Sequence, residues 1–260
     1  MNADVFILAR LGSSRLPEKH LKLIDGTPAI KQLVDRLKRA KKVRNIIVCT
    51  TTLASDNKLV NFLLKEGISF FRGNEKDVLI RFLEATKQFK TDIMIDVEGD
   101  KVYSDPFYID KIITIMEEEN VDFVMGTNST KFDPTDHFTH GIIPTGVRVS
   151  ALKKLCETKK SSNTETGYKE FFITNKIFSK RFIKPEVLPK NAKKIRLTLD
   201  YKEDLELANL IFKELGTNFD LHELVKLLNQ KPSLIKITSN LLTKWEKNYK
   251  NQITDFSLKN

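Results

Sequence analysis

Residues 5–19 read VFILARLGSSRLPEK, an apolar run that ends in a short loop rich in glycine, serine and positive charge. The run does not alternate between polar and apolar residues, which indicates a strand buried on both faces of a sheet. Gly12 allows a tight turn and a close approach of the backbone to a ligand. Arg10, Arg15 and Lys19 add three cations, which suit the oxygens of a triphosphate. A basic loop facing solvent is the simpler alternative, but the position directly after a first strand favours a phosphate site.

Further apolar runs alternate with amphipathic stretches along the chain. The runs cover residues 46–50, 68–71, 93–97, 123–125, 146–149 and 195–199. Helical patterns cover residues 29–39, 56–66, 77–89, 106–118, 204–215 and 221–228. This alternation predicts an α/β fold with a doubly wound, mostly parallel sheet flanked by helices. Ligands bind such a sheet at the carboxyl ends of its strands, so the chemistry is expected directly after the strands.

No linker divides the chain. One domain is therefore expected over residues 1–245, with a less regular acceptor or flap segment at residues 127–194 inside it. Residues 246–260 are expected to form a polar C-terminal tail.

The overall composition limits the classes of partner. The formal net charge is +10, from 44 lysines and arginines against 34 acidic residues. The lysines are spread along the whole chain and no nucleic-acid motif is present, so no nucleic-acid partner is expected. No apolar run is long enough to cross a membrane and no signal peptide is visible, so no membrane partner is expected either. Cys49 and Cys156 have no metal-ligand spacing, which indicates a reducing compartment and a cytoplasmic location.

Two aspartates follow apolar runs far apart in the chain. Asp100 follows the run at residues 93–97, and Asp200 follows the run at residues 195–199. Two carboxylates at the strand tips of one sheet would suit magnesium, which takes one or two carboxylates together with phosphate oxygens and waters. The alternatives are a turn residue for Asp100 and a helix N-cap for Asp200.

Three segments together resemble a known family. ARLGSSRLPEKHL (residues 9–21), EGDKVYSDP (residues 98–106) and RLTLDYKEDLELA (residues 196–208) occur in the order of the motifs of cytidylyltransferases that make CMP-activated sugar acids. The resemblance is strongest to the branch of spore-coat polysaccharide biosynthesis, and more distant to the CMP-Kdo and CMP-sialate synthetases. It implies a Rossmann-like fold of the nucleotide-diphospho-sugar transferase type and a homodimer.

The resemblance also implies roles for particular residues. Catalysis would involve Arg10, Arg15, Lys19, Asp100 and Asp200. The two aspartates would hold Mg²⁺, for which Mn²⁺ can substitute. The CTP site would be lined by Leu8, Ala9, Arg10, Gly12, Ser13, Ser14, Arg15 and Lys19.

The segment FFRGNEKDVLIRFLEAT (residues 70–86) resembles the part of the family that contacts the pyrimidine and ribose. It adds Arg72, Asp77 and Arg81 to the predicted nucleotide site. A helix cap for Asp77 and an exposed helix face for Arg81 are the alternatives. One departure from the family lies beside Asp100, where Lys101 and Val102 stand in place of a frequent proline.

The acceptor site is less well marked. The residues implied are Lys101, His140, Arg148, Tyr168 and Lys169. His137 and His140 stand three residues apart in a loop-like segment, which is a poor zinc site because no helix holds the spacing and no further ligand is marked. An acceptor-binding loop and an ordinary surface loop remain open for them.

The expected reaction is transfer of CMP from CTP to an anionic small molecule, with release of pyrophosphate. No general base is clearly placed, which slightly favours an already ionised phosphonate or phosphate monoester over a sugar acid. The alternatives are a nucleotidyltransferase using another nucleotide, a glycosyltransferase, and a non-catalytic nucleotide-binding module. A glycosyltransferase is disfavoured because residues 98–100 lack the usual Asp-x-Asp pattern.

Overall fold

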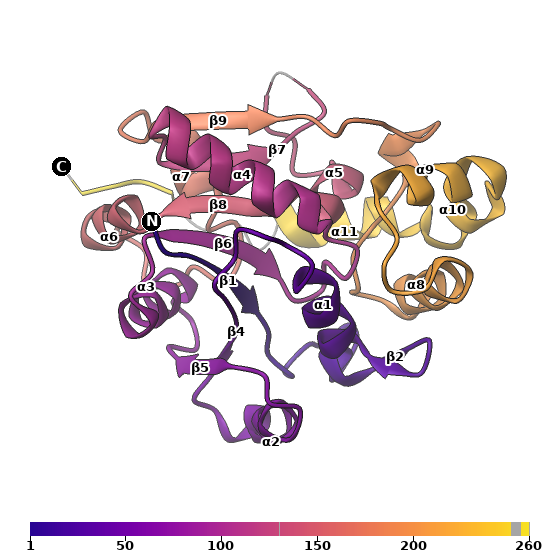
Figure 1. Ribbon diagram of the computed structural model, residues 1–260, viewed down its shortest axis with the longest axis horizontal. Coiled ribbons are helices and arrows are strands. Elements are labelled where there is room, and N and C mark those ends of the chain that lie inside the picture. Colours follow the sequence, from indigo (N-terminus) through magenta and orange to yellow (C-terminus); the bar gives the residue numbers. More distant parts are fainter. Residues whose placement is uncertain (130, 251–255, 260) are drawn as a thin grey trace.

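The computed structural model describes residues 1–129, 131–250 and 256–259. Its centre is a seven-stranded sheet in the order β5-β4-β1-β6-β8-β7-β9 (Figure 1). The strands are β1 (Ala3–Leu8), β4 (Asn45–Thr51), β5 (Phe70–Gly73), β6 (Ile93–Glu98), β7 (Phe123–Gly126), β8 (Thr145–Arg148) and β9 (Lys180–Ile183). All of them run in one direction except β8, which is antiparallel to both of its neighbours. The predicted doubly wound, mostly parallel α/β sheet is therefore confirmed.

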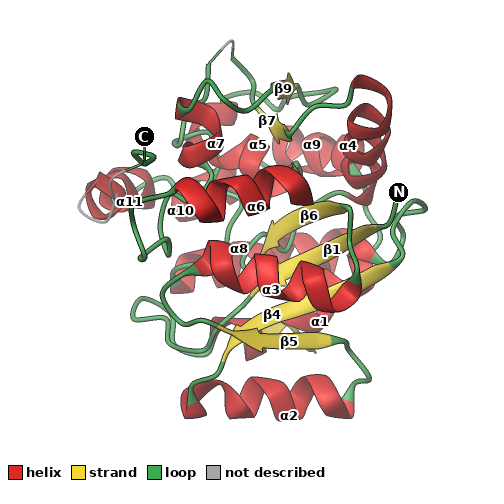
Figure 2. Ribbon diagram, turned by 90° about the vertical axis from the view of Figure 1, so that its left-hand side faces the viewer, coloured by secondary structure: helices red, strands yellow, loops and turns green. Residues whose placement is uncertain are grey.

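Helices cover both faces of this sheet. They are α1 (Ala29–Leu37), α2 (Asn57–Lys65), α3 (Val78–Phe89), α4 (Pro106–Glu119), α5 (His137–Ile142), α6 (Val149–Thr158), α7 (Glu170–Thr174), α8 (Lys202–Leu215), α9 (Leu221–Gln230), α10 (Ser233–Thr238) and α11 (Leu241–Lys250). A two-stranded hairpin, β2 (Leu23–Ile24) and β3 (Thr27–Pro28), lies between β1 and α1. Figure 2 shows α3 and α6 on one face of the sheet. None of the helices in the described part of the chain is long and apolar enough to cross a membrane.

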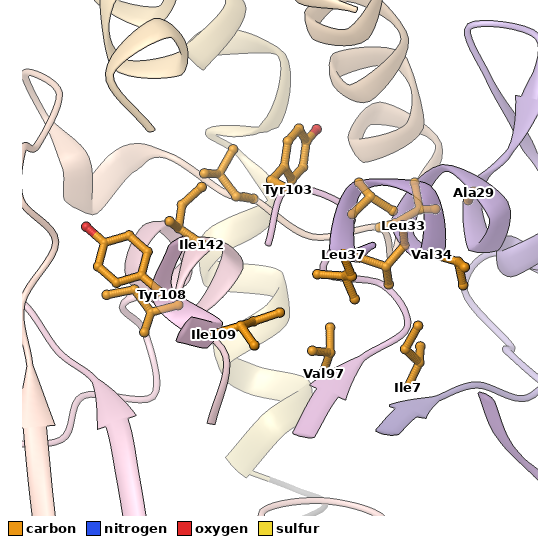
Figure 3. Close-up of a cluster of buried hydrophobic side chains, with 14 of the residues drawn as sticks. Ile7, Ala29, Leu33, Val34, Leu37, Val97, Tyr103, Tyr108, Ile109 and Ile142 are labelled. Carbon is orange, nitrogen blue, oxygen red and sulfur yellow. The ribbon is translucent and has the colours of Figure 1, made fainter. Parts of the chain in front are cut away.

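Two hydrophobic cores follow from the alternation of side chains along the strands. Val5 and Ile7 of β1 point into the core under α1, α2 and α4, whereas Phe6 points into the core under α3 and α6. Figure 3 shows the first core, in which Ile7 and Val97 lie below α1. Strands buried on both faces are apolar at most successive positions, which explains the nearly continuous apolar runs in the sequence.

The predicted strand at residues 195–199 is wrong. This segment is buried but pairs with no strand in the described structure. It packs instead against α5, where Gly141 lies so close that an added Cβ would stand 2.3 Å from the carbonyl oxygen of Leu197. Burial on all sides gives the segment the composition of a central strand without the hydrogen bonding of one.

The C-terminal residues pack against the domain. The helix α11 continues across residue 245, the predicted boundary of the tail. Phe256 packs edge-on against Phe171 with 5.3 Å between ring centroids, and Leu258 forms an isolated bridge with Lys159. Residues 251–255 and 260 of the predicted tail, and residue 130 of the predicted flap, lie outside the described residues. The division into domain, flap and tail stays a prediction.

Candidate functional site

A cavity of about 310 Å³ lies at the carboxyl ends of β1 and β6. Its walls include the loop after β1, the turn after β6, the start of α3, the segment before α7, and Asp200. The residues predicted for phosphate binding that line it are Arg10, Gly12, Ser13, Ser14, Arg15 and Lys19. The loop after β1 therefore opens onto this cavity, as the strand-end position predicts.

Lys19 lies between the two predicted metal ligands. Its ammonium nitrogen is 2.6 Å from Oδ2 of Asp100 and 2.9 Å from Oδ1 of Asp200. Burial opposes the charge on Lys19, but the two carboxylates outweigh it and raise the pKa of this lysine. One ammonium group thus brings together acids that stand a hundred residues apart.

Asp100 owes its position to the glycine before it. The backbone of Gly99 donates to the carbonyl oxygen of Leu8 at 2.8 Å, which ties the turn to the end of β1. A Cβ on Gly99 would stand 2.7 Å from that oxygen and 2.8 Å from the ring of His20, so a larger residue would displace the turn. His20 is buried, and burial together with Lys19 lowers its pKa to about 4, so it remains a neutral packing partner.

Asp200 is held by a second set of charges. Arg196 donates to Asp200 at 2.8 Å and to Asp204 at 3.0 Å, and the guanidinium of Arg15 is 3.0 Å from Asp200. Asp204 in turn accepts from the backbone N–H groups of Asp200 and Tyr201, each at 2.9 Å. Burial disfavours charge on Asp200, but the surrounding cations outweigh it and hold its pKa well below the usual range. Tyr201, and not Asp200, occupies the N-cap position of α8.

Asp100 and Asp200 are the carboxylates available to a magnesium ion, although both oxygens of Asp200 already pair with cations. Oδ1 of Asp100 is buried and has no hydrogen-bond partner among the described residues, so one carboxylate oxygen remains available. No three His, Cys, Asp or Glu side chains form a metal-binding cluster within the described ranges. Two carboxylates alone are consistent with Mg²⁺, because this ion usually completes its octahedron with substrate phosphates and waters.

Other predicted nucleotide residues have structural partners. Leu8 and Arg81 line the cavity, whereas Ala9, Arg72 and Asp77 do not. Asp77 caps α3 and pairs with the buried Lys159, which is the alternative left open by the sequence. Arg72 donates to the carbonyl oxygens of Thr51 and Leu53, each at 2.9 Å. Arg81 is buried and donates to the carbonyl oxygens of Asn74 and Glu75, each at 2.7 Å, so it stabilises the wall and is not an exposed helix residue.

A second cavity of about 90 Å³ adjoins the first and shares lining residues with it. The predicted acceptor residues that line it are Lys101, His140, Tyr168 and Lys169. The hydroxyl of Tyr168 donates to Asp96 at 2.7 Å, and the ammonium of Lys169 lies 3.0 Å from Glu98. Tyr168 therefore gives a hydrogen bond to one carboxylate of β6, and Lys169 neutralises another.

Arg148 is a correction to the predicted acceptor site. It ends β8, which runs antiparallel to β6, and it pairs in register with Ile93 at the start of β6. That end of the sheet is opposite to the end that carries Asp100. Arg148 donates there to the carbonyl oxygens of Val121 and Met116, at 3.3 and 2.6 Å.

The residues that line these cavities and that the sequence did not single out include His20, Glu165, Trp245 and Tyr249. Glu165 pairs with Arg10, one of the predicted phosphate ligands. His20 directly follows the predicted lysine, and this adjacency is the one local signal that could have identified it. Trp245 and Tyr249 stand in a polar C-terminal stretch that carries no motif.

Glu170, beside the second cavity, makes the stability of the protein depend on pH. Burial raises the pKa of its carboxyl to about 7, above its ordinary value of 4.5. The folded state therefore binds more protons than the unfolded state between these values, and stability falls as pH rises through this window. We expect Glu170→Gln, which is always neutral, to gain about 2 kcal/mol relative to the unchanged protein between pH 5 and pH 8. Urea unfolding of both proteins at the two pH values measures this difference, and an equal difference at both would contradict it.

Comparison with known proteins agrees with the geometry. A family model described as cytidylyltransferase matches residues 5–211. The spore coat polysaccharide biosynthesis protein SpsF of Bacillus subtilis is 28% identical over 247 residues, which cover 89% of this chain and 96% of that protein. An 8-amino-3,8-dideoxy-manno-octulosonate cytidylyltransferase of Shewanella pealeana is 30% identical over 131 residues, which cover 49% of this chain and 52% of that protein. The solved structure of a cytidylyltransferase from Leptospira borgpetersenii has a TM-score of 0.78 and 26% identity, over 90% of this chain and 97% of the other.

Proposed function

We propose, from the premise that this chain belongs to the cytidylyltransferase family, that it transfers CMP from CTP to an anionic small-molecule acceptor with the help of magnesium. The observation that carries this proposal is the position of Lys19 between Asp100 and Asp200, beside the loop with Arg10 and Arg15. This arrangement puts cationic donors and a pair of carboxylates at one cavity, which is what a nucleoside triphosphate and its metal require.

In the proposed reaction an acceptor oxygen forms a bond to the α-phosphorus of CTP, and where that oxygen is a hydroxyl its O–H bond breaks and the proton passes to solvent. The bond between this phosphorus and the oxygen that bridges to the β-phosphate breaks, and pyrophosphate leaves. Arg15 and Lys19 would stabilise the negative charge that develops on the leaving phosphates, because both lie beside the carboxylate pair. A magnesium ion on Asp100 and Asp200 would supply Lewis acidity at the α-phosphate. Otherwise the protein mainly aligns the two substrates.

The acceptor that we propose is a sugar acid, with a phosphonate or phosphate monoester as the second choice. The absence of a marked general base in the sequence favours the phosphorus compounds. The relative from Shewanella pealeana, however, is named for an octulosonate, and the relative from Bacillus subtilis for polysaccharide biosynthesis. Both names favour a sugar acid. The homodimer and the cytoplasmic location stay predictions.

The proposed function is tested by pyrophosphate release. Purified protein with Mg²⁺ and CTP is combined in turn with sugar acids, alkylphosphonates and phosphate monoesters, and release is expected with a member of one of these classes. A thermal-shift series with CTP, UTP, GTP and ATP complements it, because a ligand that binds the folded state raises the melting temperature. We expect the largest increase with CTP and Mg²⁺. A larger increase with another nucleotide, or no release with any acceptor class, would contradict the proposal.

A further inference from the structure

The helix α11 lies outside the part of the chain that matches the family model, yet it reaches the site. The match ends at residue 211, whereas α11 covers Leu241–Lys250. Figure 2 shows α11 as a separate helix at the edge of the molecule. Its Asn248 donates to the hydroxyl of Tyr201 at 3.2 Å, and Tyr201 directly follows the predicted metal ligand Asp200. The helix is therefore attached beside the site and not merely appended to the domain.

Two aromatic side chains of α11 line both cavities. Trp245 and Tyr249 stack with 4.8 Å between their ring centroids and an interplanar angle of 17°. The hydroxyl of Tyr249 donates to Glu170, and the ring of His137 meets Trp245 edge-on at 4.3 Å. Contacts with two other helices thus fix the aromatic pair in place. It forms an apolar wall at the junction where the nucleotide cavity meets the smaller one.

Two histidines, His137 and His140, also line the smaller cavity, and His137 lies beside Trp245. His140 stacks on Phe132 with 5.5 Å between ring centroids. The Nε2 atoms of His137 and His140 are buried and have no hydrogen-bond partner in the described part of the chain. Burial and neighbouring cations lower the pKa of His137 to about 2 and that of His140 to about 3, so both rings are uncharged at neutral pH. An uncharged imidazole can donate a hydrogen bond to a hydroxyl or accept one from it, but it has no positive charge with which to bind an anion.

We propose that Trp245 and Tyr249 determine the acceptor specificity of this enzyme by forming an aromatic wall against which a hydroxylated sugar-acid ring packs, with ring hydroxyls on His137 and His140. The charged end of the acceptor lies toward Lys101, whose side chain lines both cavities. This inference rests on the proposed function and narrows its acceptor to a ring compound. An open-chain alkylphosphonate has no ring face to bury against the aromatic wall and no set of ring hydroxyls for the histidines.

The first experiment measures binding without turnover. Trp245 is the only tryptophan in the chain, so its fluorescence reports on this wall alone. Titration with 3-deoxy-manno-octulosonate in the presence of Mg²⁺ is expected to change the emission, whereas 2-aminoethylphosphonate is expected to leave it unchanged. An emission change with the phosphonate alone, or none with a sugar acid at a concentration that saturates turnover, would overturn the inference.

The second experiment separates the acceptor from the nucleotide. Trp245→Ala is expected to raise KM for the sugar acid about tenfold, because the acceptor loses the apolar contact with one ring face. KM for CTP is expected to change less than twofold. Trp245→Phe should recover most of the difference, which shows that the loss comes from the ring face and not from unfolding. Lys247→Ala, on an exposed position of the same helix, is the matched control and should behave as the unchanged protein.

The failures of the two proposals can be told apart. If pyrophosphate is released with phosphonates but with no ring acceptor, the proposed function stands and the aromatic wall is wrong. If Trp245→Ala raises KM for both substrates equally, the wall is again wrong, because it would then support the whole site. If no acceptor class supports release, the proposed function fails, and the fluorescence titration alone decides whether a sugar acid binds at Trp245.

Discussion

Replacement of Asp100 with alanine is expected to lower kcat for pyrophosphate release by about three orders of magnitude while the protein stays folded. The loss of activity follows from the loss of one of two carboxylates proposed to hold magnesium. The fold should survive, because Asp100 contributes one ion pair, and its partner Lys19 keeps Asp200. Steady-state kinetics and thermal unfolding of the same preparation measure both effects.

The control for this variant is Asp35→Ala. Asp35 also pairs with lysines, but these pairs are partly exposed on α1 and Asp35 does not line the cavity. Exposed pairs of this kind contribute about 0–1 kcal/mol, so neither activity nor stability should change much. Activity of Asp100→Ala within tenfold of the unchanged protein would show that Asp100 is not a metal ligand.

Replacement of Asp200 with alanine is expected to abolish turnover and also to destabilise the fold. Asp200 balances Lys19, Arg15 and the fully buried Arg196. Removal of one partner from a buried ion network costs about 3–5 kcal/mol, because charges remain buried without compensation. For a chain of this size the melting temperature should fall by about 10 °C. The two aspartates therefore differ in their effect on stability although their proposed catalytic roles are similar.

A second substitution at this position separates the two effects. Asp200→Asn keeps the shape and the acceptor oxygen of the side chain but removes its charge. We expect it to be as inactive as Asp200→Ala and to lose less stability. Full activity in Asp200→Asn would contradict the proposed metal site, and a melting temperature equal to that of Asp200→Ala would show that shape contributes nothing to the network.

The sequence predicts the features that depend on local chemistry. The apolar residues 5–8 of β1 and the cationic loop after them are neighbours in the chain and can be recognised in the sequence. The structure places that loop at the cavity. The sequence predicts that Asp100 and Asp200 converge, but on partly wrong grounds, because Asp200 does not follow a strand. Contacts with Arg196, Asp204 and Lys19 hold Asp200 in place instead.

Features that depend on strand direction or on remote packing could not be predicted. The sequence of a four-residue strand does not reveal which way the strand runs, and the reversed direction of β8 carries Arg148 to the opposite end of the sheet. Trp245 reaches the cavity only because α11 folds back over residues that precede it by about a hundred positions. No local pattern records such a contact, since it results from tertiary packing.

The ammonium group of Lys19 means that this protein carries its own counterion. Two carboxylates that approach one site in an otherwise vacant pocket would repel each other and oppose folding. Here a covalently attached cation offsets that repulsion as soon as the chain folds. The two carboxylates therefore need no divalent ion to balance their charge in the folded state, and if the proposed magnesium site is correct, removal of the metal stops catalysis while the protein stays folded.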